Sequence, residues 1–498
     1  MSGRRLVVVS NRLPLTAKRQ NGVVTLLPSS GGLVTALLPV LRASGGCWIG
    51  WTGCDADADL AEALKQCAGP NYSFEPVSLS PVENACYYRG CCNQIIWPLF
   101  HGLPSRCDFD PAFWDCYCAV NGKFADAVGQ TWRVDDFIWV HDYHLMLLGE
   151  YLRARSLGCR VGYFHHIPFP HPEVLEKLPW RTQLLSAMLQ FNILGFQTVR
   201  DRRNFVASVR HFLPHVRIRS LDSGVLVRTG DQSALVGTYP ISIDFEKFTR
   251  VAVEDAVLAA AATIRRDLRD TRIVLGVDRL DYTKGILERL KSFEALVQTH
   301  PELRQCVSML QVVVPSREDI DEYRQLKFAI ERQVSQINGK YATPGWVPVH
   351  YLYRNLARQE LVALYRAADV ALLTPLRDGM NLVAKEFCAC RVDDTGALVL
   401  SEFAGAAAEL NCGAIIVNPY DTEGVASALH RALCLNEREQ HSRMAAMRNT
   451  IRFHNVFQWS RSFIQEASPL KVVARSAAMP LTSVPDADSG MRATGALA

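Results

Sequence analysis

The sequence predicts an α/β protein with two doubly wound parallel-sheet domains in tandem. Short apolar runs of strand length alternate with longer helical stretches through nearly the whole chain, which is typical of βα units. The alternation breaks once, near residues 236–248, where a proline marks a crossover before a new first strand. We therefore expect a first domain over residues 1–240 and a second over 241–467. Residues 468–498 are small, polar and aperiodic, which predicts a disordered tail.

The composition and charge of the chain indicate which classes of binding partner fit it. The chain has 498 residues, 49% of them apolar, and its net charge of +4 comes without any block of like charges. Nucleic acid and acidic membranes are therefore not indicated, whereas an anionic small molecule fits. The first apolar run is too short for a signal peptide, and no stretch approaches the roughly 20 apolar residues of a membrane span. We expect a cytoplasmic protein.

The 15 cysteines include no CxxC pair and show no zinc-ligand spacing. They predict reduced, mostly buried thiols and no metal site.

The first strand is predicted at residues 5–10, and Arg12 follows it directly. A polar loop comes next, and Ser29-Ser30-Gly31-Gly32 then opens a helix at Leu33. Paired glycines at a helix start allow a ligand to approach the main chain closely. A simple turn is the alternative.

Polar side chains follow later strands of this domain. The strand at 137–145 ends in a cluster that contains Asp142, and the strand that begins at Arg160 ends in His165-His166. Because parallel strands bring their carboxyl ends to one edge, these residues predict one shared site. Tyr88 and Trp97 are aromatic residues near polar loops, typical of sugar sites, although buried core aromatics are the alternative.

In the second domain, basic residues follow two strands. Arg279 and Lys284 come after the strand that begins at Arg272, and Arg317 comes after the strand at Val307–Val314. Charge-assisted hydrogen bonds from such groups could neutralise a diphosphate without a metal ion. The alternative for each is an ordinary surface charge.

The stretch from Thr374 to Glu386 predicts a strand, a tight loop and a helix over Leu382–Cys390 capped by Asn381. Its loop lies at the carboxyl end of a buried strand, where α/β sheets bind ligands. The helix start suits a diphosphate, and Glu386, one turn further on, suits a pair of sugar hydroxyls. An ordinary βα unit, with Asp378 as a turn residue, is the alternative.

Several enzyme classes lack their signatures in this chain. Neither a GxGxxG fingerprint nor a GxxxxGK[ST] phosphate loop is present, which argues against NAD enzymes and P-loop NTPases. A GxSxG nucleophile elbow is also absent. A pair of carboxylates placed as in a glycosidase does not stand out.

Eight short motifs occur in order: SNRLP, SSGGL, WPLFH, HDYH, HIPFP, RLDYTKG, INGKY and TPLRDGMNLVAKE. In sequence and spacing, the chain resembles the trehalose-6-phosphate synthases, retaining glycosyltransferases of the GT-B architecture, over about residues 5–465. The resemblance implies two Rossmann-like domains that face each other across a catalytic cleft, with the last helix crossing back to the first domain. It also implies transfer of glucose from UDP-glucose to glucose 6-phosphate, which gives α,α-trehalose 6-phosphate and UDP, with no cofactor or essential metal.

The resemblance also assigns roles to residues. Catalysis falls to Arg279, Lys284, His166 and Asp378, with His166 near the reacting carbon and His165 unassigned. The donor UDP-glucose is expected to contact Gly31, Gly32, Arg279, Lys284, Asp378, Gly379, Met380, Asn381, Leu382, Val383 and Glu386. The acceptor glucose 6-phosphate is expected to contact Arg12, Tyr88, Trp97, Asp142 and Arg317.

These roles allow retention without a covalent intermediate. The leaving phosphate oxygen, stabilised by Arg279 and Lys284, accepts the proton of the incoming hydroxyl while an oxocarbenium-like transition state forms. Three alternatives stay open: another nucleotide donor, another phosphorylated acceptor such as glycerol phosphate, and a non-catalytic sugar-phosphate sensor. A separate trehalose-6-phosphate phosphatase and a homo-oligomer are compatible partners. Oxidation of the cysteine-rich segment 86–92 beside Tyr88 is expected to impair acceptor binding.

Overall fold

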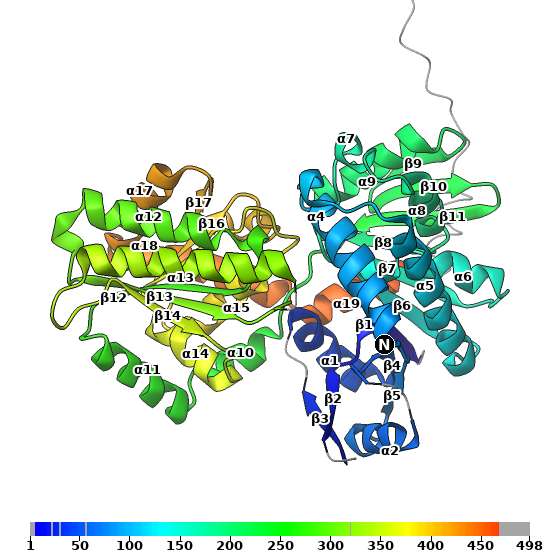
Figure 1. Cartoon of the computed structure of the whole chain (residues 1–498), viewed down its shortest axis with the longest axis horizontal. Helices are drawn as coiled ribbons and strands as arrows, with labels where there is room; N and C mark the ends of the chain where they lie inside the picture. Colours follow the sequence, from blue (N-terminus) through cyan, green and yellow to red (C-terminus); the bar gives the residue numbers. More distant parts are fainter. Residues whose placement is uncertain (1–4, 21–22, 29–30, 55–56, 319, 468–498) are drawn as a thin grey trace, which may run out of the picture.

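Two α/β domains lie side by side in the computed structural model of the chain (Figure 1). The structure describes residues 5–20, 23–28, 31–54, 57–318 and 320–467. The predicted tail 468–498 and Ser29-Ser30 of the glycine motif lie outside the described residues.

The first domain contains a nine-stranded sheet with the order β5-β4-β1-β6-β7-β8-β11-β10-β9. Its strands are β1 (Leu6–Arg12), β4 (Gly46–Trp51), β5 (Tyr72–Pro76), β6 (Phe137–His141), β7 (Arg160–His165), β8 (Ile193–Phe196), β9 (Arg217–Leu221), β10 (Gly224–Thr229) and β11 (Gln232–Thr238). Its helices are α1 (Gly32–Ser44), α2 (Ala58–Cys67), α3 (Pro81–Glu83), η1 (Asn84–Ile96), α4 (Trp97–Phe100), η2 (Pro104–Arg106), α5 (Pro111–Thr131), η3 (Tyr143–Leu145), α6 (Leu148–Ala154), α7 (Pro172–Leu175), α8 (Arg181–Met188) and α9 (Val199–Phe212).

The second domain contains a six-stranded, wholly parallel sheet with the order β14-β13-β12-β15-β16-β17. Its strands are β12 (Arg272–Arg279), β13 (Val307–Val314), β14 (Val349–Tyr353), β15 (Val370–Leu373), β16 (Ala397–Ser401) and β17 (Ile415–Val417). The helices of this half are α10 (Phe245–Val251), α11 (Asp255–Asp267), η4 (Tyr282–Lys284), α12 (Ile286–Thr299), η5 (Pro301–Leu303), α13 (Asp321–Tyr341), α14 (Arg358–Ala367), α15 (Leu382–Cys390), α16 (Ala407–Leu410), α17 (Thr422–Leu433), α18 (Glu437–Phe453) and α19 (Val456–Glu466).

Both sheets are doubly wound in the way that the sequence predicts. The six parallel strands of the second sheet follow the order 3-2-1-4-5-6, which is the order of the Rossmann fold. The first sheet has the same order in its first six strands, and a seventh parallel strand, β11, follows β8. The order reverses between β1 and β6 in the first sheet and between β12 and β15 in the second. Ligands of such sheets bind outside the carboxyl ends of the strands at this reversal.

Local structure differs from the sequence-based prediction in three places. The segment predicted as a polar loop after β1 forms an antiparallel hairpin of β2 (Leu15–Gln20) and β3 (Val23–Pro28). The strands β10 and β9 run antiparallel at one edge of a sheet predicted to be parallel. The segment that carries Tyr88, η1, is a π-helix, a rare form that is often found at functional sites.

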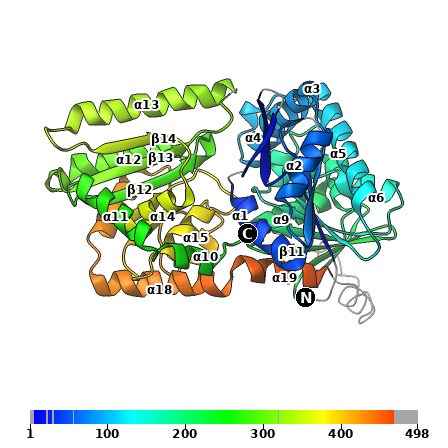
Figure 2. The ribbon, with the colours of Figure 1, turned by 90° about the horizontal axis from the view of Figure 1, so that it is seen from below.

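The chain passes between the domains twice. It first crosses between β11 and α10, and it returns where α18, along one side of the second domain, leads into α19 (Figure 2). In α19, Phe463 stacks on Trp139 of β6 at 4.9 Å between ring centroids. An added Cβ at Gly162 or Gly195 would lie 2.8 or 2.7 Å from the Phe463 ring, so these two strands need glycine there.

No helix in the described part of the chain combines the length and apolarity that crossing a membrane requires.

Candidate active site

The predicted site residues gather where the two domains contact each other. Arg12 ends β1 and Asp142 follows β6, so both flank the reversal of strand order in the first sheet. Arg279 ends β12 and Asp378 follows β15, in the equivalent positions of the second sheet. The two reversals therefore supply polar groups from both domains to one region.

Direct contact between the domains is made by Gly379. A Cβ added there would lie 2.0 Å from the main-chain oxygen of His166, so no side chain fits between the two segments. On its other side, a Cβ added at Gly405 would lie 1.9 Å from the Gly379 oxygen. Glycine at both positions lets the loop after β15 approach the end of β7.

Two guanidinium groups, one from each domain, lie near Tyr88. The Arg12 Cζ lies 4.0 Å from the centroid of the Trp51 ring and 5.8 Å from that of Tyr88. Burial alone would raise the pKa of the Tyr88 phenol, but the charges of Arg317 and Arg12 outweigh it and lower that pKa. Burial also lowers the pKa of Arg12, which makes an anionic ligand favourable beside it.

Arg317 reaches from the second domain to the aromatic residues of the first. Its Cζ lies 4.3 Å from the Trp97 ring centroid, a cation–π contact, and its Nη2 lies 3.4 Å from the Tyr143 hydroxyl. Asp281 pairs with Arg317 Nη1 at 3.2 Å. The same Nη1 also donates a hydrogen bond to the Tyr323 hydroxyl. The guanidinium is thus held in place, and its Nε is buried with no hydrogen-bond partner among the described residues.

Asp142 lies in a strained turn between these groups. Its φ of 75° is in the left-handed region, and its carboxylate accepts a hydrogen bond from its neighbour's main-chain N–H at 2.9 Å. Burial raises the pKa of this carboxyl to about 6, against the lowering effect of the main-chain N–H groups of Tyr143 and His166 and the charge of Arg279. A sugar hydroxyl could donate to it.

The two cations assigned to the diphosphate differ in environment. Arg279 is exposed and, among the described residues, forms no ion pair or side-chain hydrogen bond. Lys284 instead donates to Asp378 Oδ2 at 2.6 Å, with both side chains largely buried. Asn381 Nδ2 also approaches Asp378 Oδ2, at 3.3 Å. The structure thus pairs two residues that the sequence placed on different parts of the donor.

The helix α15 begins beside this pair. Asn381, with φ 85°, caps it by accepting a hydrogen bond from the Ala384 N–H at 3.0 Å. The Tyr365 hydroxyl donates to Glu386 Oε2 at 2.9 Å, while burial raises the pKa of Glu386 to about 7. A Cβ at Gly32, the first residue of α1, would lie 2.8 Å from Leu382 Cδ1, so the start of α1 adjoins α15.

The remaining donor-side residues are arranged around the same helix start. Gly31 precedes α1 with φ 156° and has open space where a Cβ would be. Met380 is buried, and its main-chain oxygen accepts a hydrogen bond from the Ala406 N–H at 2.7 Å. Val383 is half-buried in the first turn of α15.

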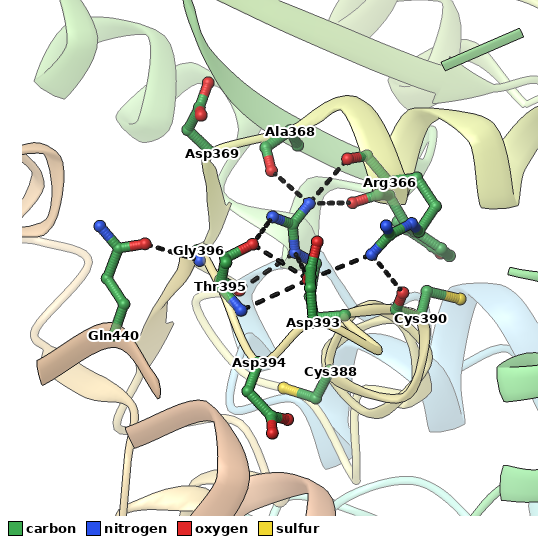
Figure 3. Close-up of polar contacts among 12 residues, drawn as sticks. Arg366, Ala368, Asp369, Cys388, Cys390, Asp393, Asp394, Thr395, Gly396 and Gln440 are labelled. Carbon is green, nitrogen blue, oxygen red and sulfur yellow. Dashed lines mark hydrogen bonds and ion pairs between the residues drawn. The ribbon is translucent and has the colours of Figure 1, made fainter. Parts of the chain in front are cut away.

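The other end of α15 is closed by arginines. Arg366 donates to the Cys390 oxygen at 3.3 Å (Figure 3). Arg448 donates to the Cys388 oxygen at 3.1 Å and to the Ala389 oxygen at 2.7 Å. Cations at a helix carboxyl end favour its dipole and satisfy its last carbonyl groups. The opposite end of α15, with free N–H groups, faces the domain contact.

The two adjacent histidines of β7 and its loop lie in different environments. His165 is fully buried among phenylalanine rings and contacts the Tyr163 hydroxyl at 2.9 Å, so it is a core histidine. His166 is half-buried, and its two ring nitrogens lie 3.0 Å from His141 Nδ1 and 3.4 Å from Gln197 Nε2. Burial and the neighbouring His165 lower the pKa of His166 to about 3.

Sequence reasoning missed several residues that hold this site. Asp281, which pairs with Arg317, lies inside the RLDYTKG motif and was passed over. Arg289 is fully buried, pairs with Asp278 at 2.6 Å and donates to the Lys284 oxygen at 3.3 Å. Asp281 sits inside a quoted motif, whereas nothing in the local sequence marks Arg289, because its partners are distant along the chain.

Among the described residues, one group has the residue types of a metal site: His300, Glu302 and His430. It lies at the carboxyl ends of α12 and α17, away from the domain contact. The two imidazole rings stack at 3.9 Å with an interplanar angle of 4°. Their in-plane lone pairs therefore run parallel and do not converge on a common ion.

Two Rossmann-like domains that contact each other at the carboxyl ends of their strands, with cationic, aromatic and acidic side chains between them, are the architecture of a glycosyltransferase of the GT-B class. The sequence model of the family "Glycosyltransferase family 20" matches residues 4–469. The chain belongs to this family.

Known members are similar along most of this chain. "Alpha,alpha-trehalose-phosphate synthase [UDP-forming] A" of Dictyostelium discoideum is 38% identical over 93% of this chain, which spans 62% of that relative's length. A solved E. coli structure, "Trehalose-6-phosphate from E. coli bound with UDP-2-fluoro glucose", has a TM-score of 0.85 and 36% identity, covering 93% of this chain and 98% of that one. The Burkholderia xenovorans alpha,alpha-trehalose-phosphate synthase, solved with glucose-6-phosphate, has a TM-score of 0.84 and 34% identity, covering 93% and 100%.

Proposed function

We propose that this glycosyltransferase transfers glucose from UDP-glucose to glucose 6-phosphate with retention, and so makes α,α-trehalose 6-phosphate and UDP. The observation that carries the proposal is the placement of Arg12 and Arg317, from different domains, close enough to Tyr88 that both charges lower the pKa of its phenol. Two guanidinium groups beside aromatic rings and Asp142 suit a sugar that bears a phosphate. The likeness to solved relatives bound to a UDP-sugar analogue and to glucose 6-phosphate supports it.

Arg12 and Arg317 bind the acceptor's phosphate in this proposal, while Tyr88 and Trp97 contact its sugar ring. Asp142 accepts a hydrogen bond from a sugar hydroxyl. We assign the phosphate to these two arginines because both are positively charged and both act on Tyr88.

On the donor side, Arg279 is exposed and forms no ion pair with any residue that the structure describes, so its guanidinium is available for the diphosphate. Lys284 reaches it by exchanging part of its contact with Asp378, which is then free to accept a hydrogen bond from a glucose hydroxyl. The N-terminal end of α15 and the main chain at Gly31 add N–H groups. Glu386 accepts hydrogen bonds from the ribose hydroxyls.

The transfer step then requires that the charge on the leaving phosphate be stabilised and that the two substrates be held in position. As the glycosidic C–O bond to phosphate breaks, Arg279 and Lys284 stabilise the negative charge on the leaving oxygen. That oxygen takes the proton of the incoming hydroxyl on the same face of the sugar, so the anomeric configuration is kept. His166, held between Asp142 and Gly379, lies beside the reacting carbon.

The test is a matrix of donors and acceptors. The purified chain is incubated with UDP-, ADP- or GDP-glucose and with glucose 6-phosphate or glycerol 3-phosphate, and nucleoside diphosphate release and product mass are measured. We expect a disaccharide phosphate formed mainly from UDP-glucose, and a loss of at least a hundredfold in kcat/KM in Arg279→Ala. Product with glycerol 3-phosphate alone would contradict the acceptor assignment.

We also expect turnover without a metal ion. Since Arg279 and Lys284 supply the positive charge at the diphosphate, kcat should change less than twofold when the enzyme is treated with EDTA and dialysed. A loss of activity that Mg²⁺ or Mn²⁺ restores would contradict this part of the proposal.

All 15 cysteines are unpaired, which fits a reducing compartment, and we propose the cytoplasm as the site of the reaction.

A further inference from the structure

A single residue of the first interdomain crossing is held by both domains. The main-chain N–H of Ile241 donates to Gln197 Oε1, in the first domain, at 2.9 Å. The main-chain oxygen of Ile241 accepts a hydrogen bond from Lys385 Nζ, on α15, at 2.8 Å. Lys385 also pairs with Glu409 Oε2 at 2.6 Å. The crossing is therefore fastened on each side by one side chain.

The hydrogen bonds continue into the first domain. Gln197 Nε2 lies 3.4 Å from His166 Nδ1, and His166 Nε2 lies 3.0 Å from His141 Nδ1. We call the series His141, His166, Gln197, Ile241, Lys385 and Glu409 the relay.

The direction of the relay follows from its chemistry. A main-chain N–H needs an oxygen acceptor, so the Ile241 N–H fixes the orientation of the Gln197 amide. The Gln197 Nε2 then donates to His166 Nδ1, which leaves the proton of the neutral imidazole on Nε2, where it points at His141. Both ring nitrogens of His166 are thus engaged within the protein. Burial lowers the pKa values of His166 and His141, in agreement with neutral rings.

The middle of the relay is shielded from water, whereas His166 and Glu409 are half-buried. Gln197, Ile241 and Lys385 are 2%, 2% and 1% exposed. A buried ammonium or amide that loses its partner has a large unfavourable desolvation energy, so these bonds resist exchange with solvent. The arrangement of the groups that they join is accordingly well defined.

The relay contacts both halves of the site, through His166 and through Lys385. The main chain of His166 donates to the Asp142 carboxylate on the acceptor side, and its oxygen packs on Gly379 in the donor loop. Lys385 directly precedes Glu386 on α15. A change in the position of α15 is therefore transmitted through Ile241 to His166.

We propose that Gln197 and Lys385 are positioning residues, which act through Ile241 to hold His166 and α15 in one arrangement. The inference rests on the proposed function. With the relay intact, the donor's reacting carbon is presented to the acceptor hydroxyl and not to water. With the relay broken, both substrates bind less well and a larger share of the donor is hydrolysed.

The test compares Gln197→Met and Lys385→Met with matched controls. The controls, Gln458→Met on α19 and Lys327→Met of the Lys327–Glu331 pair, make the same chemical changes at exposed or half-buried positions. UDP release is measured with and without glucose 6-phosphate, together with disaccharide formation. We expect each relay variant to raise both KM values and the hydrolysed share at least fivefold, and the controls to stay within twofold of wild type.

A double variant tests whether the two residues act through one route. Because both effects pass through Ile241, Gln197→Met/Lys385→Met should be no worse than the more severe single variant, whereas independent effects would multiply. Gln197→Glu keeps the oxygen for Ile241 and loses only the N–H for His166, so it remains available if the Met variants fold poorly, with a smaller effect expected.

Some outcomes would overturn the inference. If the relay variants lower kcat but leave both KM values and the hydrolysed share unchanged, the residues serve stability alone. Multiplying effects in the double variant would also contradict the relay. An inactive wild-type chain would instead overturn the proposed function, and the inference with it, before any variant is compared.

Discussion

Glu386 shows how one residue's surroundings set a testable property. Glu386 is half-buried on α15, accepts a hydrogen bond from Tyr365, and the pKa of its carboxyl is raised to about 7. In the proposed role, the ionised form accepts hydrogen bonds from the donor's ribose. An ionised acceptor binds a hydroxyl more strongly than a neutral one, by about 1 kcal/mol.

We therefore predict that the KM for UDP-glucose rises roughly fivefold as the pH falls from 8 to 6, an effect of about 1 kcal/mol. The Glu386→Gln variant cannot ionise and should show a flat, raised KM over this range. Steady-state kinetics at saturating acceptor measure it. An equal pH dependence in the variant would assign the titration to another group.

The same pKa has a consequence for stability. A carboxyl whose pKa is higher in the folded than in the unfolded state binds its proton more tightly when folded, so the free energy of unfolding falls as pH rises from about 4 to 7. In the Glu386→Gln variant, the free energy of unfolding should lack this part of the decrease with rising pH. Denaturation midpoints of both proteins at pH 5 and pH 8 provide the comparison.

Burial disfavours the reactive thiolate form of Cys91 and Cys92, two of the three cysteines in segment 86–92, and of their neighbour Cys116. Burial raises the pKa of Cys116 to about 11 and those of Cys91 and Cys92 well above their ordinary value, so little thiolate exists at neutral pH. Five of the 15 cysteines are buried, six are half-buried and four are exposed, fewer buried than predicted. We predict that mild peroxide changes the KM for glucose 6-phosphate less than twofold over an hour; a rise that thiol reductant reverses would contradict this.

At the scale of elements, the end of α14 depends on one buried arginine. Arg391 donates from Nη1 to the main-chain oxygens of Tyr365, Arg366 and Ala368, at 3.2, 2.7 and 2.9 Å. Arg366 and the loop through Asp393 and Thr395 surround it (Figure 3). These oxygens would lose their partner if the guanidinium were removed.

We predict that Arg391→Met lowers the free energy of unfolding by roughly 2–4 kcal/mol, since buried carbonyl groups left unpaired cost about 1–3 kcal/mol each. The matched control is Arg354→Met, which removes an exposed ion pair with Glu360 and should change the free energy of unfolding far less, because water screens exposed ion pairs. Chemical denaturation of the two variants gives the difference. Equal losses would show that the carbonyl contacts contribute little.

The elements themselves were predictable to different degrees. The helix at Leu382–Cys390 and the strand at Val307–Val314 match the prediction to the residue, because apolar pattern and capping residues are local signals. The hairpin after β1 was missed, since Leu15–Gln20 mixes charged and apolar residues as a loop would. The π-helix η1 was missed too, because helix propensity does not separate it from an α-helix.

The site was predictable as a set of strand-end residues but not as a set of contacts. Strand order places Arg12, Asp142, Arg279 and Asp378 at the two reversals, and that much follows from the βα pattern. The stacking of Arg317 on Trp97 joins residues of different domains, and no local pattern encodes it. The contact between Gln197 and Ile241 likewise depends on how the domains pack.

At the scale of the whole molecule, the approach of the two domains depends on Gly379. Its hydrogen faces the His166 oxygen at a distance that excludes a methyl group. We predict that Gly379→Ala lowers kcat/KM at least a hundredfold while each domain stays folded, because the domains cannot come together to the same extent. Circular dichroism and thermal denaturation, beside steady-state kinetics, separate the two effects.

The control is Gly339→Ala, at an exposed position of α13 with open space around it. Alanine there should keep full activity and add up to about 1 kcal/mol of stability through its helix propensity. Full activity in Gly379→Ala would show that the contact with His166 is dispensable.

The return of α19 to the first domain means that the first domain is built from two separate pieces of chain, whereas the second domain is one continuous piece. The two crossings run close together, because the Val456 N–H donates to the Ile243 oxygen at 3.0 Å. Two adjacent crossings allow a hinge motion that opens the space between the domains. They resist rotation of one domain relative to the other about a single linker. A protease that cuts only near Ile241 would therefore leave two fragments that stay associated, since the second fragment carries Phe463, which remains packed against β6, β7 and β8 of the first.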